Sequence, residues 1–427
     1  MSEPSTPLQI PDYRRYWLAR FLAVAATLSV VVLIGYQTYD IARADYGMSR
    51  PEAAFQLGLL GLAQFIPLFL LTPVAGLAAD RFDRRFVACM ANLVDITIAL
   101  SIAYLTWTDG LTLPLCFALA AAHGAARVFN GPAMAAIAPN IVSPQLLPKA
   151  VALSSIGFTA GQVTGPALGG LLFAANATLP YLVSAAMLAC SAMLVISIRP
   201  IRAQHRSDLH PLRQMIEGLQ FAWRDRFLLG CISLDLFAVL MAGATALLPV
   251  FARDILQVGA EGLGFMRAAP AAGAGLVALT LAIRPLERNV GAKMLWAVAV
   301  FGAATVAFAF SRYFMLSLGL LAILGGADMV SVFVRSTLIQ LNTPDQMRGR
   351  VSSISGLAIS ASNELGEMQS GIAAAILGAT GAVVFGGVGA ILVTAVWAVI
   401  FPELRWAKTF APQYRQSAPK ERPEKRE

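Results

Sequence analysis

Ionisable side chains inside long apolar stretches are the residues of this sequence that could do chemistry. A charge in the hydrocarbon of a membrane is costly, so such a residue normally faces a partner or a water-filled pathway. Ion pairing and the uptake and release of protons are the chemistry available there. The residues expected to line a polar cavity or to take up and release protons are Asp95, Arg127, Asp235, Asp328, Arg335, Glu364 and Glu367, together with the polar Asn130.

Two of the carboxylates, Glu364 and Glu367, are three residues apart and therefore share one face of a helix. They cannot both carry a charge cheaply, so one of them is expected to hold a proton. A group that couples transport to protons needs this property. The alternative is simple neutralisation by Arg335 or Arg267.

Matching depth suggests a further pair. At 1.5 Å per residue, Arg127 lies about 16 Å and Asp95 about 14 Å from the same end of their apolar stretches. We therefore predict an ion pair between Asp95 and Arg127, with a purely structural pair as the alternative. His123, close to Arg127, is expected to be a buried histidine with its hydrogen bonds satisfied. Asp328 and Arg335 are seven residues apart and share a helix face.

The elements that carry these residues are predicted to be membrane helices. Hydrophobic residues make up 57% of the chain and charged residues 13%, whereas a soluble protein carries about 25% charged residues. About twelve apolar runs are long enough to cross a bilayer. Their predicted limits are 17–39, 54–79, 86–107, 112–138, 149–175, 179–198, 228–251, 263–284, 291–311, 314–340, 351–377 and 382–402.

The net charge of +8 reflects basic residues that gather on one side of the membrane. With a cytoplasmic N-terminus, roughly 24 of the 32 Lys and Arg residues lie on cytoplasmic segments and about 4 on external loops. This distribution argues against a nucleic-acid partner and puts both termini in the cytoplasm. No phosphate-binding loop, metal spacing or nucleophile–base pair is present in the sequence, so we expect no enzyme, no metal and no cofactor.

A polar interruption divides the chain into two sets of six spans. We predict an N-terminal bundle over 1–198, a linker with an amphipathic helix over 199–227, a C-terminal bundle over 228–402 and a basic tail over 403–427 without regular structure. An internal repeat, SPQLLPKAVALSS at 143–155 and TPDQMRGRVSSIS at 343–355, supports the division. Ser143 and Thr343 are expected to cap the helices that follow.

The loop between the second and third spans resembles the G-x-x-x-D-[RK]-x-G-R-[RK] signature of the major facilitator superfamily. The matching residues are Gly76, Asp80, Arg81, Arg84 and Arg85, with Asp83 in place of the usual glycine. The resemblance implies that the glycine packs on span eleven and that Asp80 faces the start of that span. It further implies a cytoplasmic latch of the outward-open state. An ordinary positively charged loop is the alternative.

Two further elements resemble this superfamily. Arg127-Val128-Phe129-Asn130-Gly131 is similar to its R-x-x-Q-G element, with asparagine for glutamine, which implies a link to protons. Span five carries a sequence similar to the G-x-x-x-G-P-x-x-G-G element of the antiporter branch, with close helix packing as the alternative. Its matching residues are Gly161, Gly165, Pro166, Gly169 and Gly170.

A narrower resemblance covers nearly the whole chain. YRRYWLARFLA, GLGFMRAAPAAGAG, TPDQMRGRV and SNELGEMQSG are similar to the bacterial enterobactin-exporter-type branch. The expected fold is an all-α integral membrane protein, with twelve transmembrane helices in two pseudo-symmetric six-helix bundles. The resemblance implies a proton-coupled antiporter that exports a siderophore or another small hydrophobic or amphipathic compound.

The expected partners are a small molecule and the lipid bilayer of a bacterial inner membrane, and the protein is expected to be a monomer. Two alternatives remain open at this point. The protein could be a symporter that imports a solute, or a membrane sensor that transports nothing.

Overall fold

The first half of the chain forms six long helices. The computed structural model describes residues 6–201 and 211–410. A short 3-10 helix, η1 (Pro7–Gln9), precedes them. The long helices are α1 (Pro11–Ala44), α2 (Arg50–Arg81), α3 (Arg84–Trp107), α4 (Leu113–Ile141), α5 (Leu147–Ala175) and α6 (Leu179–Ile196).

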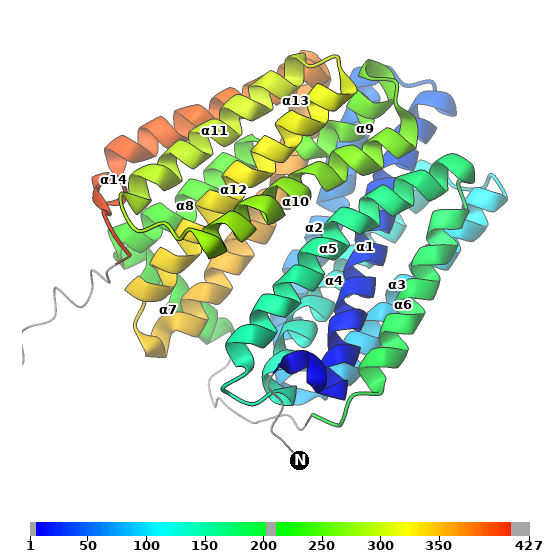
Figure 1. Cartoon of the computed structure of the whole chain (residues 1–427). Coiled ribbons are helices and arrows are strands. Elements are labelled where there is room, and N and C mark those ends of the chain that lie inside the picture. The colour runs from blue at the N-terminus through cyan, green and yellow to red at the C-terminus, as the bar shows by residue number, and fades with distance from the viewer. Residues whose placement is uncertain (1–5, 202–210, 411–427) are drawn as a thin grey trace, which may run out of the picture.

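The second half begins with a 14-residue helix within the linker and continues as long helices. Figure 1 shows the two halves side by side, the first in blue to green and the second in green to red. Its elements are α7 (Pro211–Arg224), α8 (Arg226–Met241), η2 (Ala244–Leu247), α9 (Leu248–Val250), the π-helical turn η3 (Phe251–Ile255), α10 (Gly259–Ile283), α11 (Val290–Phe310), α12 (Phe314–Asn342), α13 (Asp345–Ile400) and α14 (Pro402–Trp406).

Spans eleven and twelve are joined in one element, α13, which turns at Gly378. This glycine has φ of 73°, a left-handed conformation that side chains disfavour. Val351 and Ala390, on either side of it, lie in one hydrophobic cluster, whereas Ala374 and Ala382 lie in another. The chain therefore reverses at Gly378, and α13 supplies two crossings.

The structure is that of an all-helical membrane protein. Nine helices among the described residues are long and apolar enough to cross a membrane, and α13 is one of them. Helices α4 and α5, of 29 residues each, pack between the others. The predicted seventh span departs from the expectation, because α8 ends at Met241 and the chain continues through η2, α9 and η3.

Two local predictions are wrong. The Thr343 hydroxyl donates back to the carbonyl of Ile339 at 2.6 Å and ends α12, and Leu146 rather than Ser143 stands at the start of α5 without a side-chain cap. The start of the tail is ordered, since α14 buries Leu404. Residues 411–427 lie outside the described part of the chain.

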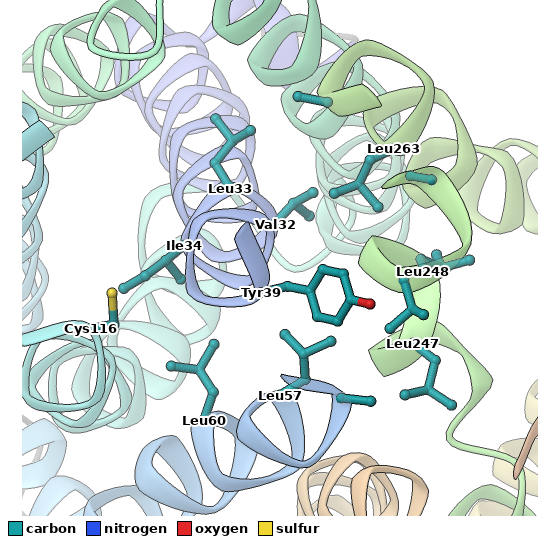
Figure 2. Close-up of a cluster of buried hydrophobic side chains, with 14 of the residues drawn as sticks. Val32, Leu33, Ile34, Tyr39, Leu57, Leu60, Cys116, Leu247, Leu248 and Leu263 are labelled. Atoms are coloured by element: carbon teal, nitrogen blue, oxygen red, sulfur yellow. The ribbon is translucent and has the colours of Figure 1, made fainter. Parts of the chain in front are cut away.

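Hydrophobic packing distinguishes the two ends of the molecule. We call the end that carries Pro11, at the start of α1, the near end, and the end that carries the α1–α2 turn and η3 the far end (Figure 1). At the far end one cluster joins both halves: Leu57 of α2 and Tyr39 of α1 lie beside Leu247 and Leu263 (Figure 2). At the near end the described buried side chains form two separate clusters, one in each half.

Close helix contacts also join the halves on the far side of the centre. A Cβ added to Gly58 of α2 would lie 3.0 Å from Cα of Gly371 in α13. One added to Gly264 of α10 would lie 3.1 Å from Cα of Gly170 in α5. Glycine allows the backbones to approach this closely, as between membrane helices generally. The halves are therefore packed tightly along α2–α13 and α5–α10.

Candidate functional site

Four charged residues meet between the halves near the middle of the molecule. Arg127 of α4 places Nη1 3.0 Å from Oε1 of Glu364 on α13. One helical turn further along α13, Glu367 Oε1 lies 3.7 Å from Nη2 of Arg267 on α10. Two positive and two negative charges thus form a group, which we call the central quartet. The Arg127–Glu364 pair links the two halves of the chain.

The two side chains of the Arg127–Glu364 pair differ in burial. The side chain of Glu364 is 6% exposed, whereas that of Arg127 is 40% exposed. A buried carboxylate is stabilised mainly by its partner, and removal of one partner is costly for the other. A proton on Glu364 would remove the attraction that ties α4 to α13 here.

A cavity adjoins the central quartet. It has a volume of about 430 Å³, part of it open to solvent, and Glu367 and Arg267 lie on its wall with Gln64 of α2. Arg267 is held in place because its Nη1 donates to the carbonyl of Thr245 at 3.0 Å. The wall also includes Thr245 and the apolar side chains of Val31, Val32, Leu57, Leu60 and Leu263.

A second buried pair lies within the second half. Asp235 of α8 and Arg335 of α12 form an ion pair with side chains 8% and 4% exposed. Asp328, half-buried on α12, interacts electrostatically with both residues. The Asp235–Arg335 pair ties α8 to α12 and does not join the halves. A role of these residues in the substrate cavity stays a prediction.

The predicted ion pair between Asp95 and Arg127 is wrong. Asp95 instead accepts at Oδ1 from His123 Nδ1 at 2.8 Å, and both side chains are 5% exposed. Equal depth along two helices does not settle the direction of a side chain around its helix axis. The long side chain of Arg127 reaches to α13 and leaves Asp95 to the histidine one turn earlier on α4.

Asn130, the asparagine of the R-x-x-Q-G-like element, belongs to a hydrogen-bond chain inside the first half. Its Nδ2 donates to Oδ1 of Asn92 at 2.7 Å, and Asn92 donates to Ser191 Oγ at 3.1 Å. Ser191 in turn donates to the carbonyl of Ala19 at 2.8 Å. Asn130 therefore connects α4 to α3, α6 and α1.

Of the expected latch at the near end, the packing of Gly76 on span eleven is absent, while the latch as a whole stays a prediction. A Cβ on Gly76 would meet no atom within 4 Å, so this glycine does not pack on span eleven. Arg81 is exposed, and Arg84 buries its Nε without a hydrogen-bond acceptor among the described residues. The side chain of Asp80 lies outside the described part of the structure.

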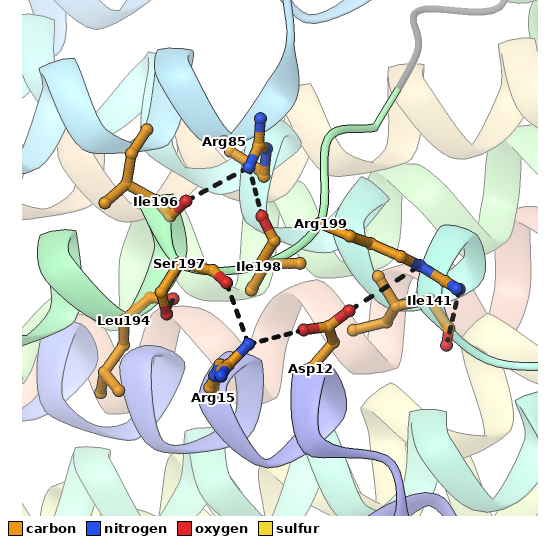
Figure 3. A network of polar contacts seen from close by, with 9 residues as sticks. All are labelled: Asp12, Arg15, Arg85, Ile141, Leu194, Ile196, Ser197, Ile198 and Arg199. Atoms are coloured by element: carbon orange, nitrogen blue, oxygen red, sulfur yellow. Dashed lines mark hydrogen bonds and ion pairs between the residues drawn. The ribbon is translucent and has the colours of Figure 1, made fainter.

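Arg85 instead forms an ion pair and hydrogen bonds inside the first half. It pairs with Asp83 at 2.7 Å and donates to the carbonyls of Ile196 and Ile198 at the end of α6 (Figure 3). Partial burial disfavours the Asp83 charge, but the hydrogen bonds from Arg85 outweigh it and hold the pKa of Asp83 below its ordinary value. Asp83 also caps α3 through the amide of Arg85 at 3.0 Å.

The antiporter-like element of α5 contacts both halves. Gly161, Gly165 and Gly169 face Val24, Ala25 and Ser29 of α1. On the other side, Gly170 and the carbonyl of Pro166 face Gly264 of α10. Small residues here allow α5 to pack closely on both neighbours.

Sequence reasoning missed a polar group at the far end, where residues of α1 and α2 meet η3. The signal was present, because most of the few basic residues on the predicted external loops lie here without an assigned role. Its members are Tyr39, Asp40, Arg43, Arg50, Arg253 and Asp254.

Comparison with known proteins identifies the family of this chain. The model of one family, described as transmembrane secretion effector, matches residues 2–422. The chain belongs to this family. It is a secondary transporter of the major facilitator superfamily and not an enzyme.

Curated proteins similar to this chain include enterobactin exporters. Those of Escherichia coli O1:K1 and Shigella boydii serotype 18 are each 27% identical to it, over 378 and 376 residues. In both comparisons the match covers 87% of this chain and 86% of the relative.

Solved structures confirm the fold. A D-xylose-proton symporter superposes with a TM-score of 0.69 at 13% identity, over 92% of this chain and 98% of the other. A bacterial homologue of the human lysosomal transporter Spinster, in an inward-facing and unoccupied conformation, gives 0.68 at 15% identity, over 95% and 97%. As a member of this transporter family, the protein is a multi-pass membrane protein with a small-molecule substrate.

Proposed function

We propose that this protein is a proton-coupled antiporter that exports a siderophore or another small hydrophobic or amphipathic compound from a bacterial cell by alternating access. The observation that carries the proposal is the Arg127–Glu364 pair, because one proton could break a contact between the halves. Such coupling requires an ionisable group whose protonation and the conformation of the transporter affect each other. The residues proposed for this role are those of the central quartet.

Protonation and substrate binding would compete at the same place. Glu367 and Arg267 belong to the quartet and also line the cavity, so a ligand there changes the surroundings of both carboxylates. The apolar wall favours a ligand with a large hydrophobic part, while Gln64 offers a hydrogen bond. The relatives described as enterobactin exporters support a siderophore as the first candidate.

The orientation proposed is that of a bacterial inner membrane protein with both termini in the cytoplasm. Roughly 24 of the 32 basic residues then lie on the cytoplasmic side, as positively charged loops require. In that orientation the near end is cytoplasmic, and the packed far end makes this an inward-facing conformation. The Gly76–Arg85 latch, which the superfamily resemblance assigns to the outward-open state, is then expected to be open. The two halves, 1–198 and 228–402, are proposed to rock against each other in a monomer.

The test measures flux in inside-out vesicles, with a catecholate siderophore and a hydrophobic dye as probes. An exporter concentrates the probe inside these vesicles when their interior is acidic. Replacement Glu364→Gln keeps the shape of the side chain but removes its charge, so proton-driven uptake should fall by about tenfold or more. Asp12→Asn is the control, since Asp12 pairs within the near end of one half.

Each result separates the alternatives. Probe loss from the vesicles that follows the outward flow of protons would favour a symporter that imports its solute. Absence of proton-dependent flux with any probe would favour a sensor. Full flux in Glu364→Gln, at normal protein amounts, would contradict the coupling role of the central quartet while leaving transport itself standing.

A further inference from the structure

Charged side chains from both halves meet at the far end, beyond the cavity. Asp254 belongs to η3 of the second half, and its side chain is 11% exposed. Its Oδ2 accepts a hydrogen bond of 2.7 Å from the hydroxyl of Tyr39 in α1. The same oxygen lies 3.2 Å from Nε of Arg50 in α2 and 3.7 Å from Nε of Arg43 in α1. Three residues of the first half thus converge on one carboxylate of the second.

A second pair runs beside the first in the reverse sense. Arg253 of η3 places Nη2 2.8 Å from Oδ1 of Asp40 in α1, and its guanidinium lies 5.9 Å from the centre of the Tyr39 ring. Here the second half provides the positive charge and the first half the negative one. The two neighbouring residues of η3 therefore engage α1 with opposite charges.

Arg43 also fixes the turn that follows α1. Its Nη1 donates to the carbonyl of Met48 at 2.5 Å, so the turn that precedes α2 is tied to the same group. Tyr39 is fully buried in the cluster that joins the halves, and Leu57 and Leu248 lie around its ring (Figure 2). The polar group thus covers the outer side of the hydrophobic contact between the halves.

The backbone that carries Arg253 and Asp254 is irregular on both sides. The chain leaves helical geometry after Met241 and passes through η2 and α9. After η3, Gln257 and Gly259 have φ of 54° and 62°. A short segment between two such breaks can change direction as a unit, because the helices beside it need not bend.

We propose that Asp254 and Arg253 form an outer gate, in which their ion pairs and the hydrogen bond from Tyr39 hold the far end closed. The proposal rests on the transport function proposed above. When the halves separate at this end, Tyr39, Arg43 and Arg50 must leave Asp254 and Arg253 must leave Asp40. Loss of Asp254 removes the shared acceptor, which favours the state open at the far end. Asp254 is a positioning residue, since it acts on the position of the halves and not on the substrate.

The test reads which end of the cavity is open, without any substrate. In a chain whose four cysteines are replaced by alanine, Ala246→Cys places one thiol on the cavity wall. A membrane-impermeant maleimide is then added from the far side or from the near side. We expect Asp254→Asn to speed labelling from the far side by about tenfold and to slow labelling from the near side, because a buried pair that loses one partner is strongly weakened.

Two milder variants keep the test decisive if Asp254→Asn folds poorly. Arg50→Gln changes a side chain that is 63% exposed, and Asp40→Asn changes one that is 46% exposed. Each should raise far-side labelling by a smaller factor than Asp254→Asn. Asp12→Asn, at the near end, should leave both rates unchanged.

Equal rates in Asp254→Asn, Arg50→Gln and the parent would overturn the gate. If the rates change as expected but no probe moves in the vesicle assay, the gate stands and the proposed export fails. If export proceeds and the labelling rates stay equal, export stands and the gate fails.

Discussion

The far end and the near end of this transporter hold the two halves in different ways. At the far end the halves share one hydrophobic cluster, close glycine contacts and the ion pairs of Asp254. At the near end each half has its own described cluster, and polar contacts such as Arg85 to Ile196 remain inside the first half. The halves therefore share one hydrophobic cluster at the far end, whereas at the near end each half has a described cluster of its own.

Under the proposed alternating access, this difference shows how one chain would support two conformations. The clusters at the near end each lie within one half, so the proposed rocking of the halves would leave them intact. Contacts between the halves must be ones that can be exchanged, and glycine surfaces and ion pairs meet this need because water can solvate the ions once they part. The Arg127–Glu364 pair lies between the two ends, and in the proposed mechanism a change of its charge would act on both.

The largest expected effect tests the stability of one half by itself. Arg335→Met leaves Asp235 buried without its partner, and we expect the free energy of unfolding to fall by about 3–5 kcal/mol. Thermal unfolding in detergent measures it. The double variant Asp235→Leu with Arg335→Met should recover most of the loss, because an apolar pair needs no compensation. Labelling of Ala246→Cys should keep its preference for one side, and a reversed preference would break the distinction between halves and ends.

A smaller effect is expected from overpacking the far end. Gly58→Leu would force α2 away from Gly371 and should weaken the closed far end by about 1–3 kcal/mol. Far-side labelling of Ala246→Cys should then rise. Gly319→Leu is the matched control, since a Cβ on this glycine of α12 meets no atom within 4 Å. Equal labelling in the two variants would show that the α2–α13 contact does not close this end.

The smallest effect concerns the near end and its pH dependence. Arg85 lowers the pKa of Asp83 below the ordinary value of 3.8, so the pair stabilises the fold above that pH. This contribution should disappear as the pH falls through the lowered pKa. Asp83 is 30% exposed, and the effect should stay below about 1 kcal/mol.

Thermal unfolding at about pH 6 and at about pH 3 compares the parent with Asp83→Asn. The variant should be less stable than the parent at the higher pH, and this difference should shrink at the lower pH. An equal difference at both pH values would contradict a contribution from the charge of Asp83.

Much of the architecture could be predicted because a membrane helix can be recognised from one continuous apolar segment. The apolar stretch at 86–107 became α3 (Arg84–Trp107), since about twenty apolar residues in a row suffice to cross a bilayer. The break after Met241 could not be predicted in this way. Gly243 there packs against Gly366 of α13, a neighbour far away in sequence.

The candidate site was predicted as a set of residues and not as a set of contacts. Arg127 and Glu364 were both expected near the middle of the membrane, and they do meet, but Arg127 was assigned to Asp95. The sequence sets the depth of a side chain along its helix. The direction of that side chain depends on how the helix is rotated against its neighbours.

The sequence by itself determined that this is a helical membrane transporter with buried charges, because hydrophobic length and the cost of charge in lipid are properties of single segments. Only the tertiary structure decided which charges meet, which end of the molecule is closed, and that Asp254 gathers three residues of the other half. These contacts join segments far apart in the sequence, with Tyr39 and Asp254 215 residues apart. Their energies depend on distance and burial, which only the packed helices define.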